Sequence, residues 1–459
     1  MKSDPSCLLR QLQKLSPAGE IRLDLASRRE NAGDKWFASH LPEAVALPRS
    51  TASVSQILRF ASKHRIPVTA RGAGYGYVGG CVPARGGIVL SLARMNRIKE
   101  IHAGDFVAVA QAGVILQTLQ DAVEKKKLYY PPDPASRADC SVGGTVATNA
   151  GGPRCLKYGV TRDYVLGLQV VMADGAIVSL GGRTHKNKTG FDLTRLITGS
   201  EGLLGVVTEV ILKLIPLPPF RALLVVGFVS MKAAARAIRE IFHHGFLPCA
   251  LEVADQFTLD AVSRRTGSKR LHHSRALIMV ELDGQEKSVR GEMRELEQLA
   301  RGRHPVFLEL AYGNAQCEQL WELRREFSFS LRDTGLIKLN QDIVVPRSRL
   351  EDLFQFTARL QKQFDLPIAC FGHAGDGNIH VNVMYDKNWP NIQARTRATL
   401  DELFRQVLAW DGVITGEHGI GLAKKRWWPL AASRELRALH QRIKQSLDPK
   451  RILNPGKFV

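Results

Sequence analysis

The stretch Arg71-Gly72-Ala73-Gly74-Tyr75-Gly76-Tyr77-Val78-Gly79-Gly80 decides between two fold classes. Residues 74–79 match the dinucleotide fingerprint G-x-G-x-x-G. That fingerprint requires the loop to open a helix whose N-terminus holds the pyrophosphate. Pro83, Gly86 and Gly87 follow closely, so no helix is expected there. The Rossmann fold is therefore excluded, and we expect the backbone amides of an irregular loop to bind an anion directly.

Two more glycine-rich loops follow, at residues 143–152 and 199–205. Because glycine lacks a Cβ, such loops let the backbone approach a ligand closely. Any one of the three loops alone is explained as a tight connection between strands. Taken jointly, they favour a large cofactor that carries phosphate.

The segments around these loops predict two α+β domains. In the first domain, the expected strands are 44–47, 67–70, 88–92, 106–111, 166–173, 176–180 and 206–215, and the expected helices are 54–61 and 115–126. Pro216, Pro218 and Pro219 mark a boundary. Beyond it, a second sheet carrying helices is expected from strands 223–230, 277–283 and 343–345 and helices 231–244, 348–364 and 395–410. A chain of 459 residues is too long for one ordinary core, which agrees with two domains.

Residues 371–382 predict a β-hairpin that carries two histidines. Asp376-Gly377 is typical of a two-residue type I′ turn, which would place His373 directly opposite His380. Directly opposed residues share a face, and Asn382 joins the same face. Glu417 and His418, between Gly416 and Gly419, could fold over the two imidazoles. A lone pair of histidines is usually coincidence, but this combination favours a metal and proton-transfer site.

Composition narrows the class of protein. The net charge is +20, but Lys and Arg are spread along the chain without a nucleic-acid motif, so we expect a solvated surface that favours anionic substrates and no nucleic-acid partner. The seven cysteines are scattered without a C-x-x-C pair, which argues against an iron–sulfur cluster within the chain. No apolar run spans a bilayer and no secretory signal is present, so a cytoplasmic location is expected, with peripheral membrane contact left open.

Several motifs occur in one order along the chain, at residues 48–51, 71–74, 131–136, 141–152, 158–165, 198–206, 371–382, 416–421 and 447–458. Together they resemble the vanillyl-alcohol-oxidase / p-cresol-methylhydroxylase (PCMH) superfamily over roughly residues 42–459. Within it, the chain is similar to the 2-hydroxy-acid dehydrogenase branch. That branch includes D-lactate dehydrogenases, D-2-hydroxyglutarate dehydrogenase and the flavin subunit of bacterial glycolate oxidase.

The resemblance implies a specific domain plan. An N-terminal extension (1–40) precedes a PCMH-type FAD-binding domain of two subdomains (41–219). A cap domain for the substrate (220–459) follows, with an antiparallel sheet and C-terminal helices, and residues 445–459 return to the FAD domain. The implied cofactor-binding residues are Arg71, Gly72, Ala73, Gly74, Tyr75, Gly76, Pro132, Asp133, Ser136, Gly143, Gly144, Thr145, Ala147, Thr148, Asn149, Gly152, Gly199, Glu201, Gly202, Gly205, Val206 and Asn454.

FAD is expected to bind without a covalent bond. Members with a flavin tethered to histidine resemble Arg-Ser-Gly-Gly-His in the first loop. Tyr75 stands at the corresponding position here, and no histidine lies between residues 65 and 101.

The resemblance also assigns the acid–base chemistry. It makes His418 the catalytic base, Arg324 the group that binds the substrate carboxylate, and His373, His380 and Glu417 the ligands of a divalent metal, Zn or Mn. Asn382 is expected to hydrogen-bond the substrate.

The implied substrate is a small 2-hydroxy acid of D configuration. Asn340 stands where the D-2-hydroxyglutarate enzymes carry a substrate lysine, which favours a monocarboxylate such as lactate or glycolate, although Lys338 lies two residues earlier. Electrons would pass to a separate acceptor, which is a quinone, a cytochrome or an iron–sulfur subunit, and the enzyme is expected to be a dimer. Two alternatives stay open: a peroxide-producing oxidase, and a flavin subunit that only relays electrons within a larger complex.

Overall fold

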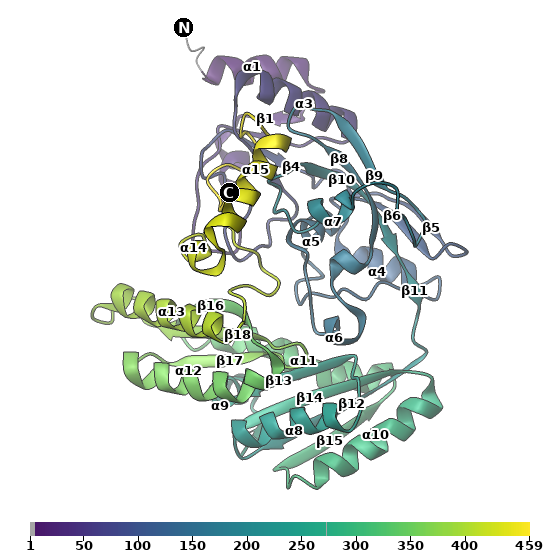
Figure 1. The fold of residues 1–459 in the computed structure, drawn as a ribbon, viewed down its shortest axis with the longest axis vertical. Coiled ribbons are helices and arrows are strands. Elements are labelled where there is room, and N and C mark those ends of the chain that lie inside the picture. Colours follow the sequence, from purple (N-terminus) through teal and green to yellow (C-terminus); the bar gives the residue numbers. More distant parts are fainter. Residues whose placement is uncertain (1–4, 272) are drawn as a thin grey trace.

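The computed structural model describes residues 5–271 and 273–459, so residues 1–4 of the predicted extension lie outside it. Figure 1 shows two bodies joined by the segment that follows β10, with the C-terminal segment lying against the N-terminal body. No helix within the described ranges is long and apolar enough to cross a membrane.

The first subdomain is built on a four-stranded sheet ordered β1(Ile21–Arg22)-β2(Ala44–Ala46)-β4(Ile88–Ser91)-β3(Val68–Arg71). The strands β2, β4 and β3 run parallel. Helix α3(Thr51–His64) connects β2 to β3, and Ser50 caps its N-terminus by accepting a hydrogen bond from Ser53 N. Helices α1(Pro5–Leu15) and α2(Leu25–Glu30) precede β2 and belong to the same body, so the N-terminal extension is part of this subdomain.

The second subdomain is an antiparallel sheet ordered β5(Ile98–His102)-β6(Val107–Gln111)-β10(Val206–Lys213)-β8(Val165–Val171)-β9(Ile177–Gly181). Its helices are α4(Leu116–Glu124), α5(Val142–Thr148), α6(Cys155–Tyr158) and α7(Leu193–Ile197). A short pair, β7(Leu128–Tyr129) and β11(Ile215–Pro216), leads to the cap.

The cap is a seven-stranded antiparallel sheet. Its order is β15(Phe307–Tyr312)-β12(Phe220–Phe228)-β14(Ala276–Gly284)-β13(Ala250–Asp255)-β17(Ile368–His373)-β18(Asn378–Tyr385)-β16(Ile337–Val344). One face packs against α8(Met231–His243), α10(Glu286–Arg301), α12(Leu350–Phe364) and α13(Ile392–Ala409). The other face packs against α9(Gln256–Thr266) and α11(Asn314–Arg332), and this face carries the candidate site.

The expected α+β class and most of the expected strands and helices are confirmed, but two predictions were wrong. Residues 142–148 form the helix α5 rather than a loop, because Ser141 caps it by accepting from Gly144 N. The hairpin turn spans four residues, 374–377, rather than two. His373 therefore pairs with Asn378, and His380 pairs with Phe371. Because the register moved by two residues, His373 and His380 still share a face.

The C-terminal segment completes the N-terminal body. After α14(Trp428–Ala431) and α15(Arg434–Leu447), Leu453 pairs with Val68 at the edge of the first sheet, and Ile452 and Leu453 enter its core. The return begins earlier than residue 445, because the amides of Leu422 and Ala423 already bond to Val78 O.

A buried lysine, Lys444, bonds the C-terminal segment to the N-terminal body. Lys444 Nζ donates to Leu203 O at 2.7 Å, to Leu453 O at 2.8 Å and to the buried carboxylate of Asp448 at 2.6 Å. One cation thus joins the loop 199–205, helix α15 and the returning strand.

Substitution Lys444→Met is expected to destabilise the protein by about 3–5 kcal/mol, because it leaves a buried carboxylate without its cation. The measurement is chemical denaturation of the purified protein. The matched control is Arg442→Met, an exposed cation on the same helix, which should change stability by no more than about 0.5 kcal/mol. Equal stability of the two variants would contradict the role given to Lys444.

Candidate active site

A cavity of ≈ 740 Å³ is lined by residues of both the N-terminal body and the cap. Its volume lies within the range of cofactor and ligand pockets. Because it reaches from the glycine-rich loops to the histidines of the hairpin, a bound cofactor there would meet the acid–base groups.

Glycines shape the cradle by letting backbone segments approach one another. A Cβ on Gly143 would lie 2.5 Å from the Ala112 Cβ, and a Cβ on Gly72 would collide with the Ser141 hydroxyl. Gly74 has a φ of +73°, which favours glycine. The residues present therefore fit a large cofactor held mainly by backbone.

Most of the predicted cofactor residues line the cavity. They are Arg71, Gly72, Ala73, Gly74, Tyr75, Gly76, Asp133, Ser136, Gly143, Gly144, Thr145, Ala147, Thr148, Glu201, Gly202, Gly205 and Val206.

Five predicted cofactor residues do not line the cavity: Pro132, Asn149, Gly152, Gly199 and Asn454. Four of them contact or closely approach other residues of the same domain instead. Asn149 ends α5 in the left-handed region and accepts from Arg162 N, and a Cβ on Gly152 would collide with the backbone of Asp133. Pro132 O accepts from Gln120, and the Asn454 amide donates to Gly80 O and Glu201 O. Gly199 has a φ of +85° and leads into the loop.

The N-terminal extension contributes residues that the sequence patterns missed. Asp34 lines the cavity, Lys35 lies over the Tyr75 ring at 4.7 Å, and Arg71 Nη1 donates to Gly33 O at 2.5 Å. Burial raises the pKa of Asp34. No periodicity or motif marks these contacts in the sequence.

If FAD is held without a covalent bond, acid precipitation of the purified protein should leave a colourless pellet and a yellow supernatant. Tyr75 stands at the position where related sequences carry the tethering histidine, which is the physical reason for release. Absorbance of the supernatant near the flavin maximum measures it. A pellet that stays yellow after washing would contradict the expectation.

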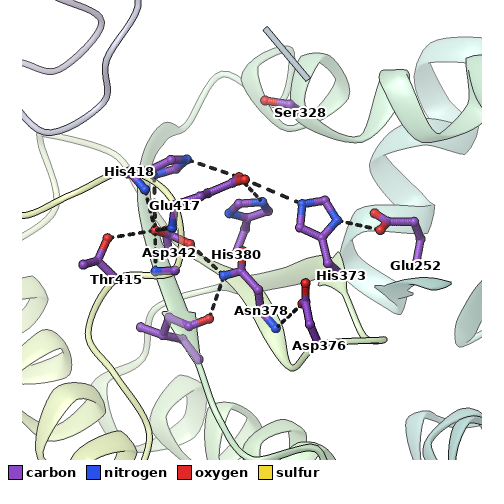
Figure 2. Close-up of polar contacts among 12 residues, drawn as sticks. Glu252, Ser328, Asp342, His373, Asp376, Asn378, His380, Thr415, Glu417 and His418 are labelled. Atoms are coloured by element: carbon purple, nitrogen blue, oxygen red, sulfur yellow. Dashed lines mark hydrogen bonds and ion pairs between the residues drawn. The ribbon is translucent and has the colours of Figure 1, made fainter. Parts of the chain in front are cut away.

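The two hairpin histidines and Glu417 form a compact group of potential ligands. Figure 2 shows the Glu417 carboxylate between three imidazoles. Glu417 Oε1 lies 3.9 Å from His373 Nε2, 3.6 Å from His380 Nε2 and 3.8 Å from His418 Nε2. One ligand atom from each of His373, His380 and Glu417 lies within 4.8 Å of the others. Two imidazoles and a carboxylate suit a divalent transition metal and leave coordination positions open.

The environments of the two imidazoles differ. Burial, then the nearby imidazoles of His418 and His373, holds the pKa of His380 well below its usual range. Burial also disfavours the charged form of His373, but the adjacent Glu252 carboxylate outweighs it and raises the pKa of His373. His380 Nδ1 and Glu417 Oε2 are buried without a hydrogen-bond partner in the described chain, which fits residues that hold a ligand.

A carboxylate that sequence patterns missed holds the loop 415–418 in place. Asp342 on β16 is fully buried, and its Oδ2 accepts from Thr415 Oγ1 and from the amides of Gly416, Glu417 and His418 at 2.8–3.0 Å. Its Oδ1 accepts from Asn378 Nδ2 at 2.7 Å. These bonds hold the backbone of the loop in a conformation in which the adjacent residues Glu417 and His418 both line the cavity. The bonding residues lie far apart in sequence, so only the fold reveals them.

His418 lies in a stack of rings at the cavity wall. Its ring centroid is 5.5 Å from that of His380 and 5.4 Å from that of Tyr77. Tyr77 comes from the first glycine-rich loop, so this stack joins the two domains at the reactive groups.

The groups expected to contact substrate divide into two sets. Arg324 on α11 lines the cavity, together with Ser328, Lys338 and Asn340. Asn382 shares the face of the histidines but is fully buried, does not line the cavity and donates to Ala369 O and His380 O. The structure thus brings Arg324 to the site and leaves Asn382 beneath it.

Comparison with known proteins agrees with this geometry. Residues 42–181 match the family described as "FAD binding domain", and residues 217–458 match "FAD linked oxidases, C-terminal domain". The glycolate oxidase subunit GlcD of Bacillus subtilis (strain 168) is 37% identical over 418 residues, covering 91% of this chain and 89% of the relative. A D-lactate dehydrogenase of Anaerostipes hadrus is 32% identical over 431 residues, covering 91% and 89%. A D-2-hydroxyglutarate dehydrogenase of Xanthomonas citri pv. viticola is 34% identical over 470 residues, covering 99% and 97%.

Two solved structures share the fold. The 4-ethylphenol oxidase from Gulosibacter chungangensis has a TM-score of 0.80 at 20% identity, covering 99% of this chain and 96% of that one. p-Cresol methylhydroxylase has a TM-score of 0.80 at 17% identity, covering 98% and 96%. These likenesses confirm the PCMH-type fold.

Proposed function

The chain belongs to the FAD-linked oxidases, and from this premise we propose that it oxidises a small 2-hydroxy acid to the 2-oxo acid. The names of the relatives support this substrate class, since glycolate, D-lactate and D-2-hydroxyglutarate are all 2-hydroxy acids. The observation that carries the proposal is the group of His373, His380, Glu417 and His418 on the wall of the cofactor cavity. FAD, when bound in that cavity, supplies the hydride acceptor.

His418 is proposed to remove the hydroxyl proton of the substrate. A neutral imidazole suits this task near neutral pH. The backbone amide of His418 is fixed by Asp342, and its ring stacks between Tyr77 and His380. The base is therefore held in one orientation before the substrate arrives, which lowers the entropic cost of reaching the reactive geometry.

His373, His380 and Glu417 would hold a divalent ion, Zn or Mn. Such an ion lowers the pKa of a bound hydroxyl and stabilises negative charge on its oxygen. The residues fit this role because their ligand atoms already converge and two of their polar atoms are unpartnered.

Arg324 is proposed to bind the substrate carboxylate. A guanidinium can bind a carboxylate through two parallel hydrogen bonds, and Arg324 has terminal nitrogens free for this within the described chain because its bond to Glu252 uses Nε. Asn340, in place of a lysine, supports a small monocarboxylate such as D-lactate or glycolate. Lys338 reaches the same cavity and donates to Ser328 Oγ at 2.7 Å, so it adds positive charge near that end.

Electrons would leave the flavin for a separate acceptor, a quinone, a cytochrome or an iron–sulfur subunit. The spacing of the seven cysteines supports this, because none belongs to a C-x-x-C pair of the kind that holds an iron–sulfur cluster. The relative named a glycolate oxidase subunit supports an assembly with partner chains. Dimer formation and peripheral contact with a membrane belong to the same proposal.

Anaerobic mixing with a panel of D- and L-2-hydroxy acids tests the function. A D-acid is expected to bleach the flavin absorbance, because the substrate hydride reduces the ring. Prior treatment with a chelator should slow bleaching by at least about tenfold, and Zn²⁺ or Mn²⁺ should restore it. Consumption of O₂ by the isolated chain would favour the oxidase alternative instead.

The variant to compare is His418→Asn. It should take up FAD normally, but the acid should reduce its flavin about 10²–10⁴-fold more slowly than that of the wild type. If no acid in the panel bleaches the wild-type flavin, the chain fits the relay alternative and the proposed function fails. If His418→Asn is reduced at the wild-type rate, the base has been misassigned.

Affinity for the acid should depend on the protonation of Lys338. Burial, then the charges of Arg332 and Arg324, lowers the pKa of Lys338 to about 7. The amine is therefore charged below pH 7 and neutral above it, so KM for the anionic acid should rise as pH increases from 6 to 8.5. In Lys338→Met, KM should be high and flat across this range.

The matched control is Lys387→Met, an exposed lysine of the cap, which should keep the wild-type pH profile. A pH profile of KM that is the same in Lys338→Met and in wild type would rule out the role of this amine.

A further inference from the structure

One buried carboxylate contacts both halves of the candidate site. Glu252 lies on β13, the central strand of the cap sheet, and pairs directly with His373 on β17. Its side chain is completely buried and does not line the cavity. Glu252 therefore cannot contact a bound molecule directly, and its effect must pass through the residues it holds.

Each oxygen of Glu252 holds a different functional side chain. Oε1 lies 2.6 Å from His373 Nδ1, and Oε2 accepts from Arg324 Nε at 2.5 Å. The carboxylate is thus shared between one proposed metal ligand and the proposed carboxylate-binding residue.

The two bonds have defined consequences for the atoms that face the cavity. In the neutral imidazole of His373, a carboxylate on Nδ1 keeps the proton on that nitrogen, so Nε2, which faces Glu417, is the nitrogen that can bind a metal. The bond to Nε holds the guanidinium plane of Arg324 while leaving the two terminal nitrogens for a ligand.

We propose that Glu252 is a positioning residue that orients His373 for the metal ion and Arg324 for the substrate carboxylate at the same time. This inference rests on the proposed function and deepens it, because it ties the metal subsite to the subsite that selects an acid. A shared carboxylate keeps the two subsites at a fixed separation, which suits a ligand whose carboxylate stands next to its hydroxyl.

The cap offers a matched control one strand away. Glu281 on β14 lies on the same face, since it pairs with Ala250, two residues from Glu252. It is also buried and holds the same helix, α11, through the Trp321 indole. Unlike Glu252 it lines the cavity, and its other partners are Arg154, Arg221 and Cys249 rather than a proposed metal ligand. Substitution of either glutamate removes a buried carboxylate that anchors α11, and only Glu252 touches His373.

The test compares Glu252→Gln with Glu281→Gln. An amide has one acceptor oxygen, and its NH₂ group faces the second donor, so glutamine cannot serve both His373 and Arg324. Mn²⁺ binding to the FAD-loaded, chelator-stripped protein is measured by calorimetry, and KM and kcat are measured for the acid that reduces the wild-type flavin. Glu252→Gln is expected to weaken Mn²⁺ binding or raise KM by at least about tenfold, while Glu281→Gln keeps Mn²⁺ binding within about twofold.

A third variant, Arg324→Lys, separates the effect of Glu252 on Arg324 from its effect on His373. It should raise KM and leave Mn²⁺ binding at the wild-type value, because His373 keeps its carboxylate. If Mn²⁺ binding and KM in Glu252→Gln both match those in Glu281→Gln, Glu252 is structural only and the inference is overturned. If the wild-type protein binds no Mn²⁺, the proposed orientation of His373 for a metal ion is overturned. If no acid reduces the flavin of the wild-type protein, the proposed function itself fails.

Discussion

The site depends on the bonds that the Asp342 carboxylate makes with the loop 415–418. That loop carries Glu417 and His418, and without a partner its amides would need water in a closed interior. The carboxylate satisfies them together, and burial in the sheet keeps it from moving. Hydrogen bonds of amides to an ionised oxygen are among the strong ones in proteins, so the loop has little freedom. Two reactive side chains are thereby held by one strand of the cap.

The FAD domain holds the neighbouring loop by a similar device. Glu201 lies in the third glycine-rich loop and accepts from the amides of Ile420 at 2.8 Å and Gly421 at 2.9 Å. The segment 415–421 is therefore bonded by one carboxylate from each domain, Asp342 and Glu201. Tyr77 adds a ring contact to His418 from the FAD side. Glu417 and His418 thus lie on a segment that residues of both domains hold in place.

Sequence patterns predicted the elements whose apolar residues follow a clear period. The helix after Ser50 and the alternating strand β18 are examples, and the shared face of His373 and His380 survived a wrong turn length because the error was an even number of residues. Sequence patterns failed to predict elements in which a charged residue lies among the buried apolar residues. Helix α11 buries Arg324 beside Trp321 and Phe327, and β13 buries Glu252, since each charge finds its partner only in the folded protein. The helix α5 was missed because Gly143 and Gly144 have low helix propensity, which the Ser141 cap and close packing override.

The return of the C-terminus has a consequence for the order of events during synthesis. Ile452 and Leu453 belong to the core of the first subdomain, whose other members lie mostly within the first hundred residues. The ribosome must therefore complete the whole cap before that core can close. Until residues 452 and 453 have been synthesised, the core of the first subdomain lacks two of its buried side chains.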